Sequence, residues 1–137
     1  MELGMGDVTS YRSRSPRHLG PQSRMRIDRL RQDRAAFELV RRVAEARSVS
    51  LRALMAGGQT RGHVGLSRRM AMYLCHTELG RTQLEVGILF GRSHGTVSYA
   101  CKTIELLRDD PVFDFALAGI EAEHRRAAAT EALRHAA

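Results

Sequence analysis

The sequence predicts an all-α protein, a small helical bundle that contains a helix-turn-helix. Apolar residues recur at helical spacing along most of the chain after residue 24. Only 5% of the 137 residues are aromatic and Trp is absent, which disfavours a β-sandwich or barrel with aromatic-rich strands. Two expected helices of about ten and sixteen residues flank the tight Gly91-Arg92 connection, which is the spacing of a helix-turn-helix.

Residues 1–24 have the composition of a disordered basic tail. They mix Gly, Ser, Pro and Arg without apolar periodicity, so they cannot bury enough surface to offset the entropy lost on ordering. Two interpretations of this tail stay open. It is either a solvated leader without a role or an arm that contacts phosphates without regard to sequence.

Residues 25–58 are expected to form an amphipathic helix and a short second helix that pack on the rest of the protein. The long helix spans Arg26 to Arg47, and the short one spans Ser50 to Ala56 before the Gly57-Gly58 pair ends it. Their apolar stripes contain Ile27, Leu30, Phe37, Val40, Val43 and Ala44 in the first helix and Leu51, Leu54 and Met55 in the second.

A basic loop at residues 59–66, which carries Arg61 and His63, precedes the predicted helix-turn-helix domain at residues 67–133. Ser67 is expected to cap the first helix of this domain, which runs to about Leu79. The buried face of this helix contains Met70, Ala71, Leu74 and Cys75.

Local start signals define the next three helices. Thr82-Gln-Leu-Glu85 has the form of a capping box and opens a helix through Phe90. Ser93 is a natural N-cap for a helix that ends near Arg108. Asp110 and Pro111 start the last helix, which runs to about Leu133 and packs through Phe113, Leu117 and Ile120. The buried stripe of the helix from Ser93 contains Val97, Ala100, Cys101, Ile104 and either Leu106 or Leu107.

Positive charge is concentrated in the first half of the chain. The net charge is +7 and the pI is about 10.6. Residues 1–69 hold 15 Arg against six acidic residues, a surplus of nine, whereas residues 70–137 hold six Arg and Lys102 against nine acidic residues. The basic half is therefore expected to bind a polyanion.

No sequence feature indicates a metal, a cofactor or a membrane partner. Cys75 and Cys101 do not belong to a C-x-x-C pair, and we expect both to be small buried side chains in a reduced cytosol. No apolar run reaches the roughly 18 residues of a membrane span. We therefore expect a cytoplasmic protein.

The first residues of the helix after Gly91-Arg92 have the side chains that base recognition requires. In a helix-turn-helix the start of the second helix points at base edges in the major groove. Hydroxyl groups and an imidazole can exchange hydrogen bonds with bases, and a glycine lets the backbone approach closely. The expected base-contacting residues are Ser93, His94, Gly95 and Thr96.

Residues 67–108 resemble the C-terminal DNA-binding domain of the bacterial replication initiator family DnaA. The family pattern is an R-x-x-A-M-x-L helix followed by E-I-G-x-x-F-G-G-R-D-H-T-T-V-x-x-A. The similarity extends more weakly back to about Phe37. The matching segments are Arg68-Arg-Met-Ala-Met-Tyr-Leu74, Glu85-Val-Gly-Ile-Leu-Phe-Gly91, Arg92-Ser-His-Gly-Thr-Val97 and Ala100-Cys-Lys-Thr-Ile104.

This resemblance implies roles for individual residues. His94 and Thr96 keep base-facing positions, and Arg92 and Arg68 become candidates for contacts to the DNA backbone. In the family an arginine of the basic loop enters the minor groove, and Arg61 is the candidate here. The backbone or minor-groove candidates are Arg61, Arg68, Arg69, Arg92 and Lys102, with a merely solvated charge as the alternative for Arg68, Arg69 and Lys102.

The sequence departs from the family pattern at several of the positions expected to contact DNA. The aspartate of the motif is Ser93 and its first threonine is Gly95, which removes a carboxylate acceptor and one hydroxyl. One glycine before Arg92 is missing, and the basic loop has fewer arginines. Because each good base contact contributes roughly 1–3 kcal/mol of discrimination, the target sequence of the family is not carried over.

No G-x-x-x-x-G-K-[ST] loop occurs, so no nucleotide partner is expected, and the chain resembles the family's DNA-binding domain used alone. No nucleophile elbow or paired-carboxylate motif indicates an enzyme. The expected function is sequence-specific binding to double-stranded DNA, as a regulator of transcription or of replication initiation. The alternative is a protein-protein interaction module that has lost base readout and binds a protein partner or forms a homodimer. RNA binding is disfavoured because aromatic side chains are scarce.

These interpretations make a first prediction about two side chains. The substitution His94→Ala should weaken specific binding far more than non-specific binding, whereas Arg68→Ala should weaken both.

Overall fold

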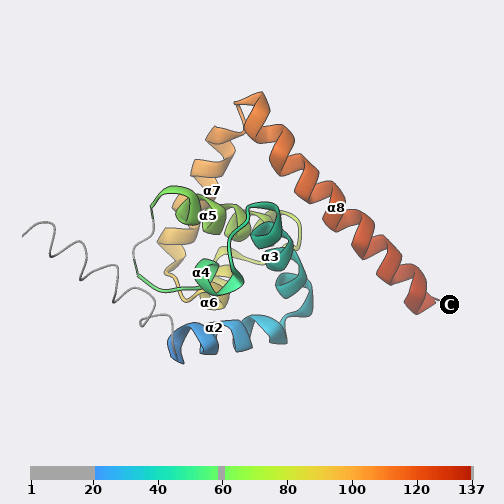
Figure 1. Cartoon of the computed structure of the whole chain (residues 1–137), viewed down its shortest axis with the longest axis horizontal. Helices are drawn as coiled ribbons and strands as arrows, with labels where there is room; N and C mark the ends of the chain where they lie inside the picture. Colours follow the sequence, from blue (N-terminus) through green and yellow to red (C-terminus); the bar gives the residue numbers. More distant parts are fainter. Residues whose placement is uncertain (1–20, 59–60, 137) are drawn as a thin grey trace, which may run out of the picture.

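The computed structural model describes residues 21–58 and 61–136, and these residues form seven α-helices (Figure 1). The expected all-α fold is confirmed, and no strand occurs in the described ranges. Nor is any helix there long and apolar enough to cross a membrane. The helices are α2 (Pro21–Gln32), α3 (Arg34–Ala46), α4 (Leu51–Leu54), α5 (Gly62–Thr77), α6 (Gln83–Phe90), α7 (His94–Leu107) and α8 (Pro111–Ala136).

The prediction of a disordered basic tail at residues 1–24 can be checked only at residues 21–24, because residues 1–20 lie outside the described residues. For residues 21–24 the expectation is wrong, since they form the first turn of α2. Ser23 is fully buried and Leu30 lies in the core, so α2 packs on the protein through one face. In Figure 1, α2 lies at the bottom of the view beneath α4 and α6.

The long helix expected from Arg26 to Arg47 is also wrong, because the chain breaks at Asp33 into α2 and α3. Asp33 is the N-cap of α3, and its carboxylate accepts a hydrogen bond from the Ala36 amide at 3.2 Å. The same carboxylate pairs with Arg81 through bonds of 2.8 and 3.0 Å. This hydrogen-bonded guanidinium lowers the pKa of Asp33 and fixes the α2–α3 corner to the segment before α6.

Helix α5 starts earlier than expected and contains most of the predicted basic loop. Ser67 does not cap it, because its hydroxyl donates to the His63 carbonyl at 2.8 Å and accepts from Arg47 at 3.0 Å inside the helix. Of residues 59–66, residues 59–60 are not described and only Arg61 precedes the helix as its N-cap. Residues 70–75 are all buried, which makes α5 the central helix against α3 and α7.

The helix-turn-helix packs as the sequence predicts. The stripe Val97, Ala100, Cys101 and Ile104 of α7 is buried, and Leu107 rather than the exposed Leu106 continues it. Helix α4 is a single turn that Ser50 caps through the Ala53 amide at 3.0 Å. The buried core joins α3, α5, α6 and α7 with Leu30 of α2 and Leu117 of α8.

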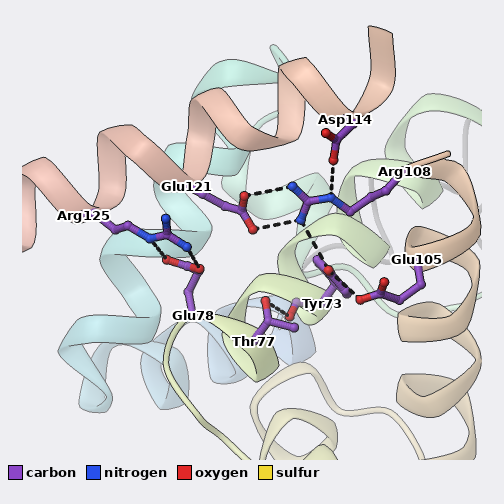
Figure 2. A network of polar contacts seen from close by, with 8 residues as sticks. All are labelled: Tyr73, Thr77, Glu78, Glu105, Arg108, Asp114, Glu121 and Arg125. Carbon is purple, nitrogen blue, oxygen red and sulfur yellow. Dashed lines mark hydrogen bonds and ion pairs between the residues drawn. The ribbon is translucent and has the colours of Figure 1, made fainter. Parts of the chain in front are cut away.

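Helix α8 starts beside the end of α7 at the top of Figure 1 and runs down past α3. As predicted, it begins at Pro111, and the Asp110 carboxylate accepts from the Val112 amide at 3.0 Å. Arg108, directly after α7, donates two hydrogen bonds to Glu121 of α8 at 2.9 and 3.0 Å (Figure 2). The sequence does not show this ion pair, which ties α8 to the end of α7.

Candidate nucleic-acid interface

The connection between α6 and α7 has the geometry of a tight helix-turn-helix. The predicted capping box at Thr82 and Glu85 is present, with bonds of 3.1 and 2.8 Å. Helix α6 ends at Gly91, whose φ of 65° lies in the left-handed region that glycine adopts without strain. The Arg92 amide then donates to the Gly87 carbonyl at 2.8 Å and turns the chain into α7.

The four expected base-contacting residues come together at the start of α7. The Ser93 hydroxyl accepts from the Thr96 amide at 3.2 Å and lies 3.0 Å from the Thr96 hydroxyl, so it caps the helix as predicted. Ser93, His94, Gly95 and Thr96 are all exposed, whereas Val97 below them is fully buried. The first turn of α7 therefore presents two hydroxyl groups, an imidazole and an open stretch of backbone on one surface.

Tyr99 extends this surface, although it was not among the residues predicted from the sequence. It lies one turn after Gly95, and Lys102 lies one turn further on the same exposed face of α7. The Tyr99 side chain is 64% exposed, and the guanidinium carbon of Arg69 from α5 lies 6.0 Å from its ring centroid. This cation–π contact joins a candidate phosphate ligand to the recognition helix. The i, i+4, i+7 spacing from Gly95 is the signal that would have found Tyr99.

Arg68 is neither a solvated charge nor exposed for contact with a DNA phosphate, the two roles that the sequence suggested. It is only 3% exposed, and it donates to the carbonyls of Leu54 at 2.7 Å and Ala53 at 3.0 Å. These carbonyls lie at the end of helix α4, where a positive charge is favoured. Arg68 is therefore a positioning residue for the segment between α4 and α5. The sequence did not reveal this role because it depends on a tertiary contact, with a carbonyl fourteen residues earlier in the chain.

Arg92 is half-buried and is bound in the same place. Its guanidinium donates to the carbonyls of Ala56 and Gly58, both at 2.8 Å. Arg26 of α2, which the sequence pattern does not single out, approaches the Met55 carbonyl at 3.4 Å. Three guanidinium groups, from α2, α5 and the turn before α7, thus surround one short segment of backbone, residues 53–58.

This arginine cluster, defined as Arg26, Arg68 and Arg92, has no carboxylate partner among the residues that the structure describes. Burial, with repulsion from Arg92, Arg26 and Arg69, lowers the pKa of Arg68 to about 10. Burial and repulsion from Arg26 also lower the pKa of Arg92. The three guanidinium groups of the cluster give this part of the molecule a concentrated positive potential.

Some arginines of the described chain pair with carboxylates, and others do not. The arginines with carboxylate partners are Arg34, Arg41 and Arg42 of α3, Arg81 between α5 and α6, Arg108 at the end of α7 and Arg125 of α8. The expected DNA-backbone candidates Arg61, Arg69 and Lys102 have no such partner in the described ranges, and Arg61 and Lys102 are exposed. Three cationic side chains without carboxylate partners in the described ranges are therefore available for the DNA backbone.

Residues 38–104 match the family model described as the bacterial dnaA protein helix-turn-helix. The chain carries a DnaA-type helix-turn-helix domain. A helix-turn-helix is a binding fold rather than a catalytic one, and it places its second helix in the major groove of DNA. Helix α2 lies wholly before the matched region, and the whole of α8 lies after it.

Several curated relatives are similar to this DnaA-type domain. A chromosomal replication initiator protein DnaA of Roseiflexus castenholzii is 40% identical over 80 residues, which cover 57% of this chain and 16% of the relative. DnaA 2 of Chlamydia trachomatis is 43% identical over 51 residues, covering 37% and 11%. DnaA 1 of the same species is 32% identical over 97 residues, covering 69% and 21%. The chain thus spans about a tenth to a fifth of these relatives' length.

Proposed function

We propose that this chain binds double-stranded DNA in a sequence-specific manner and regulates transcription or the initiation of replication. The observation that carries this proposal is the exposed first turn of α7, with Ser93 to Thr96 on one surface beside arginines that lack carboxylate partners in the described part of the chain. A protein with this function works at the bacterial nucleoid, in the cytoplasm.

In the proposed complex the first turn of α7 enters the major groove. His94 and Thr96 hydrogen-bond to base edges, and the paired hydroxyls of Ser93 and Thr96 restrict each other's rotation and so present defined donors and acceptors. Around Gly95 the space is open, since a Cβ there would have only the Ser93 hydroxyl as a neighbour, at 4.0 Å. The backbone can therefore approach the bases at this position.

Cationic side chains hold the duplex around this turn. Arg69 and Lys102 contact phosphates along the major groove, and Arg61 at the start of α5 reaches the adjacent minor groove. Arg92 adds charge beside the turn while its bonds to Ala56 and Gly58 hold the segment that leads to Arg61. Arg68 acts through the same segment rather than by direct contact, since it is buried.

The proposal is tested by selection of bound sequences from a random duplex pool, at low and near-physiological salt. An enriched motif that survives the higher salt is the expected result, because base contacts add to the salt-sensitive phosphate contacts. His94→Ala should lose preference for this motif and keep its affinity for unrelated duplex. His135→Ala is the matched control, since His135 is exposed near the end of α8, far along the chain from this turn. Equal losses on all duplexes for His94→Ala would remove its reader role.

The second candidate function is a protein-protein interaction module. One observation favours it: Val112 and Phe115 of α8 are 79% and 82% exposed, and Leu106 at the end of α7 is 72% exposed. Apolar side chains in this number on one end of a small protein fit a protein partner or a homodimer. Two results would favour this function. One is binding to duplex DNA that shows no sequence preference and is lost at higher salt, and the other is a mass above that of the monomer in light scattering.

A further inference from the structure

We propose that α2 is a second DNA-contacting element, which places the guanidinium of Arg29 on a backbone phosphate beside the bases that α7 reads. This inference rests on the proposed duplex binding and adds to it. Helix α2 ends at Gln32, before the matched region 38–104 begins, so the contact extends the interface beyond the DnaA-type domain.

The two flanks of α2 are different. Ser23 and Leu30 are buried and define the inner face of the helix. Arg26 and Arg29, one turn apart, lie on the flank that contacts the segment after α4 and the end of α6. Arg24 lies on the opposite flank, where it is exposed. The helix therefore directs only part of its positive charge toward the helix-turn-helix.

Arg26 brings this flank next to the turn before α7. Its side chain passes between two glycines on its way to the Met55 carbonyl. A Cβ at Gly57 would lie 2.8 Å from its Nη1 atom, and a Cβ at Gly91 would lie 2.7 Å from its Nε atom. Gly91 ends α6 two residues before the N-cap of α7. The close approach of Arg26 to both glycines thus fixes α2 beside the start of the recognition helix.

Arg29 is the side chain on this flank that is free to bind a phosphate. It is exposed, and its Nη1 donates to the Ile88 carbonyl near the end of α6 at 3.1 Å. A guanidinium has five N–H donors, so this bond orients the group and leaves others for an anion. No carboxylate pairs with Arg29 within the ranges that the structure describes. A cation held at this place beside the turn fits a phosphate of the duplex that α7 enters.

The test compares Arg29→Gln with Arg24→Gln, which removes the same charge from the other flank of the same helix. Binding of each full chain to the selected duplex is measured from about 50 to 200 mM salt. The logarithm of the affinity falls with the logarithm of the salt concentration by about 0.9 for each phosphate contact. Arg29→Gln should reduce this slope by about 0.9, so that its affinity falls about 3.5-fold less than that of the wild type across the range. Arg24→Gln should keep the wild-type slope.

Two further measurements locate the contact. Ethylation of single phosphates should interfere with wild-type binding at a position beside the selected motif, and Arg29→Gln should be insensitive to that modification. Arg29→Lys keeps the charge and should keep the wild-type slope. The motif selected by all variants should be the same, because α2 contacts no base.

The outcomes separate this inference from the proposed function. A wild-type chain that selects a motif, with unchanged slopes for both glutamine variants, would overturn the role of α2 and leave sequence-specific binding intact. A loss of slope in Arg29→Lys equal to that in Arg29→Gln would also overturn it, because the contact would not depend on charge. A wild-type chain that selects no motif at either salt concentration would overturn both.

Discussion

The backbones of Gly87 in α6 and Arg92 in the turn before α7 lie in direct contact. The Arg92 amide donates to the Gly87 carbonyl at 2.8 Å, and a Cβ at position 87 would lie only 2.6 Å from the Arg92 carbonyl oxygen. Since real Cβ atoms do not approach a backbone oxygen so closely, only glycine fits where the turn crosses α6. This contact sets the angle between the two helices and thereby the direction of the first turn of α7.

Gly87→Ala should destabilise the protein by roughly 1–3 kcal/mol, the usual cost of forcing an extra methyl group into a packed site. The obstacle is backbone, which cannot rotate away as a side chain would. Urea unfolding followed by circular dichroism measures the change.

Gly119→Ala is the control for this substitution. Gly119 lies in α8, and a Cβ at this position would have no neighbour within 4 Å, so alanine should stabilise α8 by up to about 1 kcal/mol through helix propensity. A Gly87→Ala protein as stable as the wild type would show that the turn moves without cost.

A second prediction concerns the neighbours Arg68 and Arg69, which the sequence treats alike. Arg68→Met should lower the free energy of unfolding by roughly 1.5–3 kcal/mol, because it removes the charged hydrogen bonds to Leu54 and Ala53. Repulsion within the arginine cluster is relieved at the same time, which keeps the loss within this range. Urea unfolding provides the measurement.

Arg69→Met should instead weaken DNA binding and leave the free energy of unfolding almost unchanged. Its side chain is partly exposed and lies over the Tyr99 ring, so stability should change by less than about 0.5 kcal/mol. The salt slope of DNA binding should fall by about 0.9 if Arg69 contacts one phosphate. Equal effects of both substitutions on stability would contradict the positioning role of Arg68.

Local chemistry made much of the fold predictable. The predicted caps at Thr82, Ser93 and Asp110 depend on side chains and amides within three residues of each other, and all three are present. The buried stripes follow from helical spacing alone. The start of α7, where the candidate base contacts lie, was therefore correctly placed from the sequence.

Errors arose where distant residues decide the structure. The break at Asp33 is supported by Arg81, 48 residues further along the chain. Ser67 is bound by Arg47, twenty residues before it, and this places Ser67 inside α5 rather than at its start. Helical spacing contains no information about such contacts. For the same reason the role of α2, which depends on Arg26 reaching between two glycines, could not be predicted.

The ion pair at the α2–α3 corner should give stability a defined pH dependence. The pKa of Asp33 is lowered in the folded protein by Arg81, so this interaction stabilises fully above the unfolded-state value near pH 4 and is lost as the pH falls through the lower folded value. Asp33→Asn keeps an N-cap acceptor but removes the charge. It should cost about 1–2 kcal/mol between pH 5 and 8. The difference from the wild type should shrink below pH 4 in urea titrations at each pH. A difference that grows on acidification would contradict this ion pair.

The last prediction concerns the network that fixes α8 (Figure 2). Arg108 donates to Glu121 through two bonds, to Asp114 at 2.5 Å and to the Tyr73 hydroxyl at 3.3 Å. Arg108→Met leaves Glu121, which is 9% exposed, without its cation. The expected loss is about 2–3 kcal/mol, less than the roughly 3–5 kcal/mol for fully buried pairs, because Arg108 is partly exposed. Hydrogen exchange should accelerate first in residues 111–121.

Arg126→Met is the matched control on α8, since Arg126 is exposed and has no carboxylate partner in the part of the chain that the structure describes. It should change stability by less than about 0.5 kcal/mol. Similar effects of the two substitutions would mean that α8 is held by Leu117 and Ile120 alone, and that the polar network follows this packing. A selective effect of Arg108→Met on α8, with unchanged exchange in α6, would show that the end of α7 fixes α8 independently of the turn at Gly91.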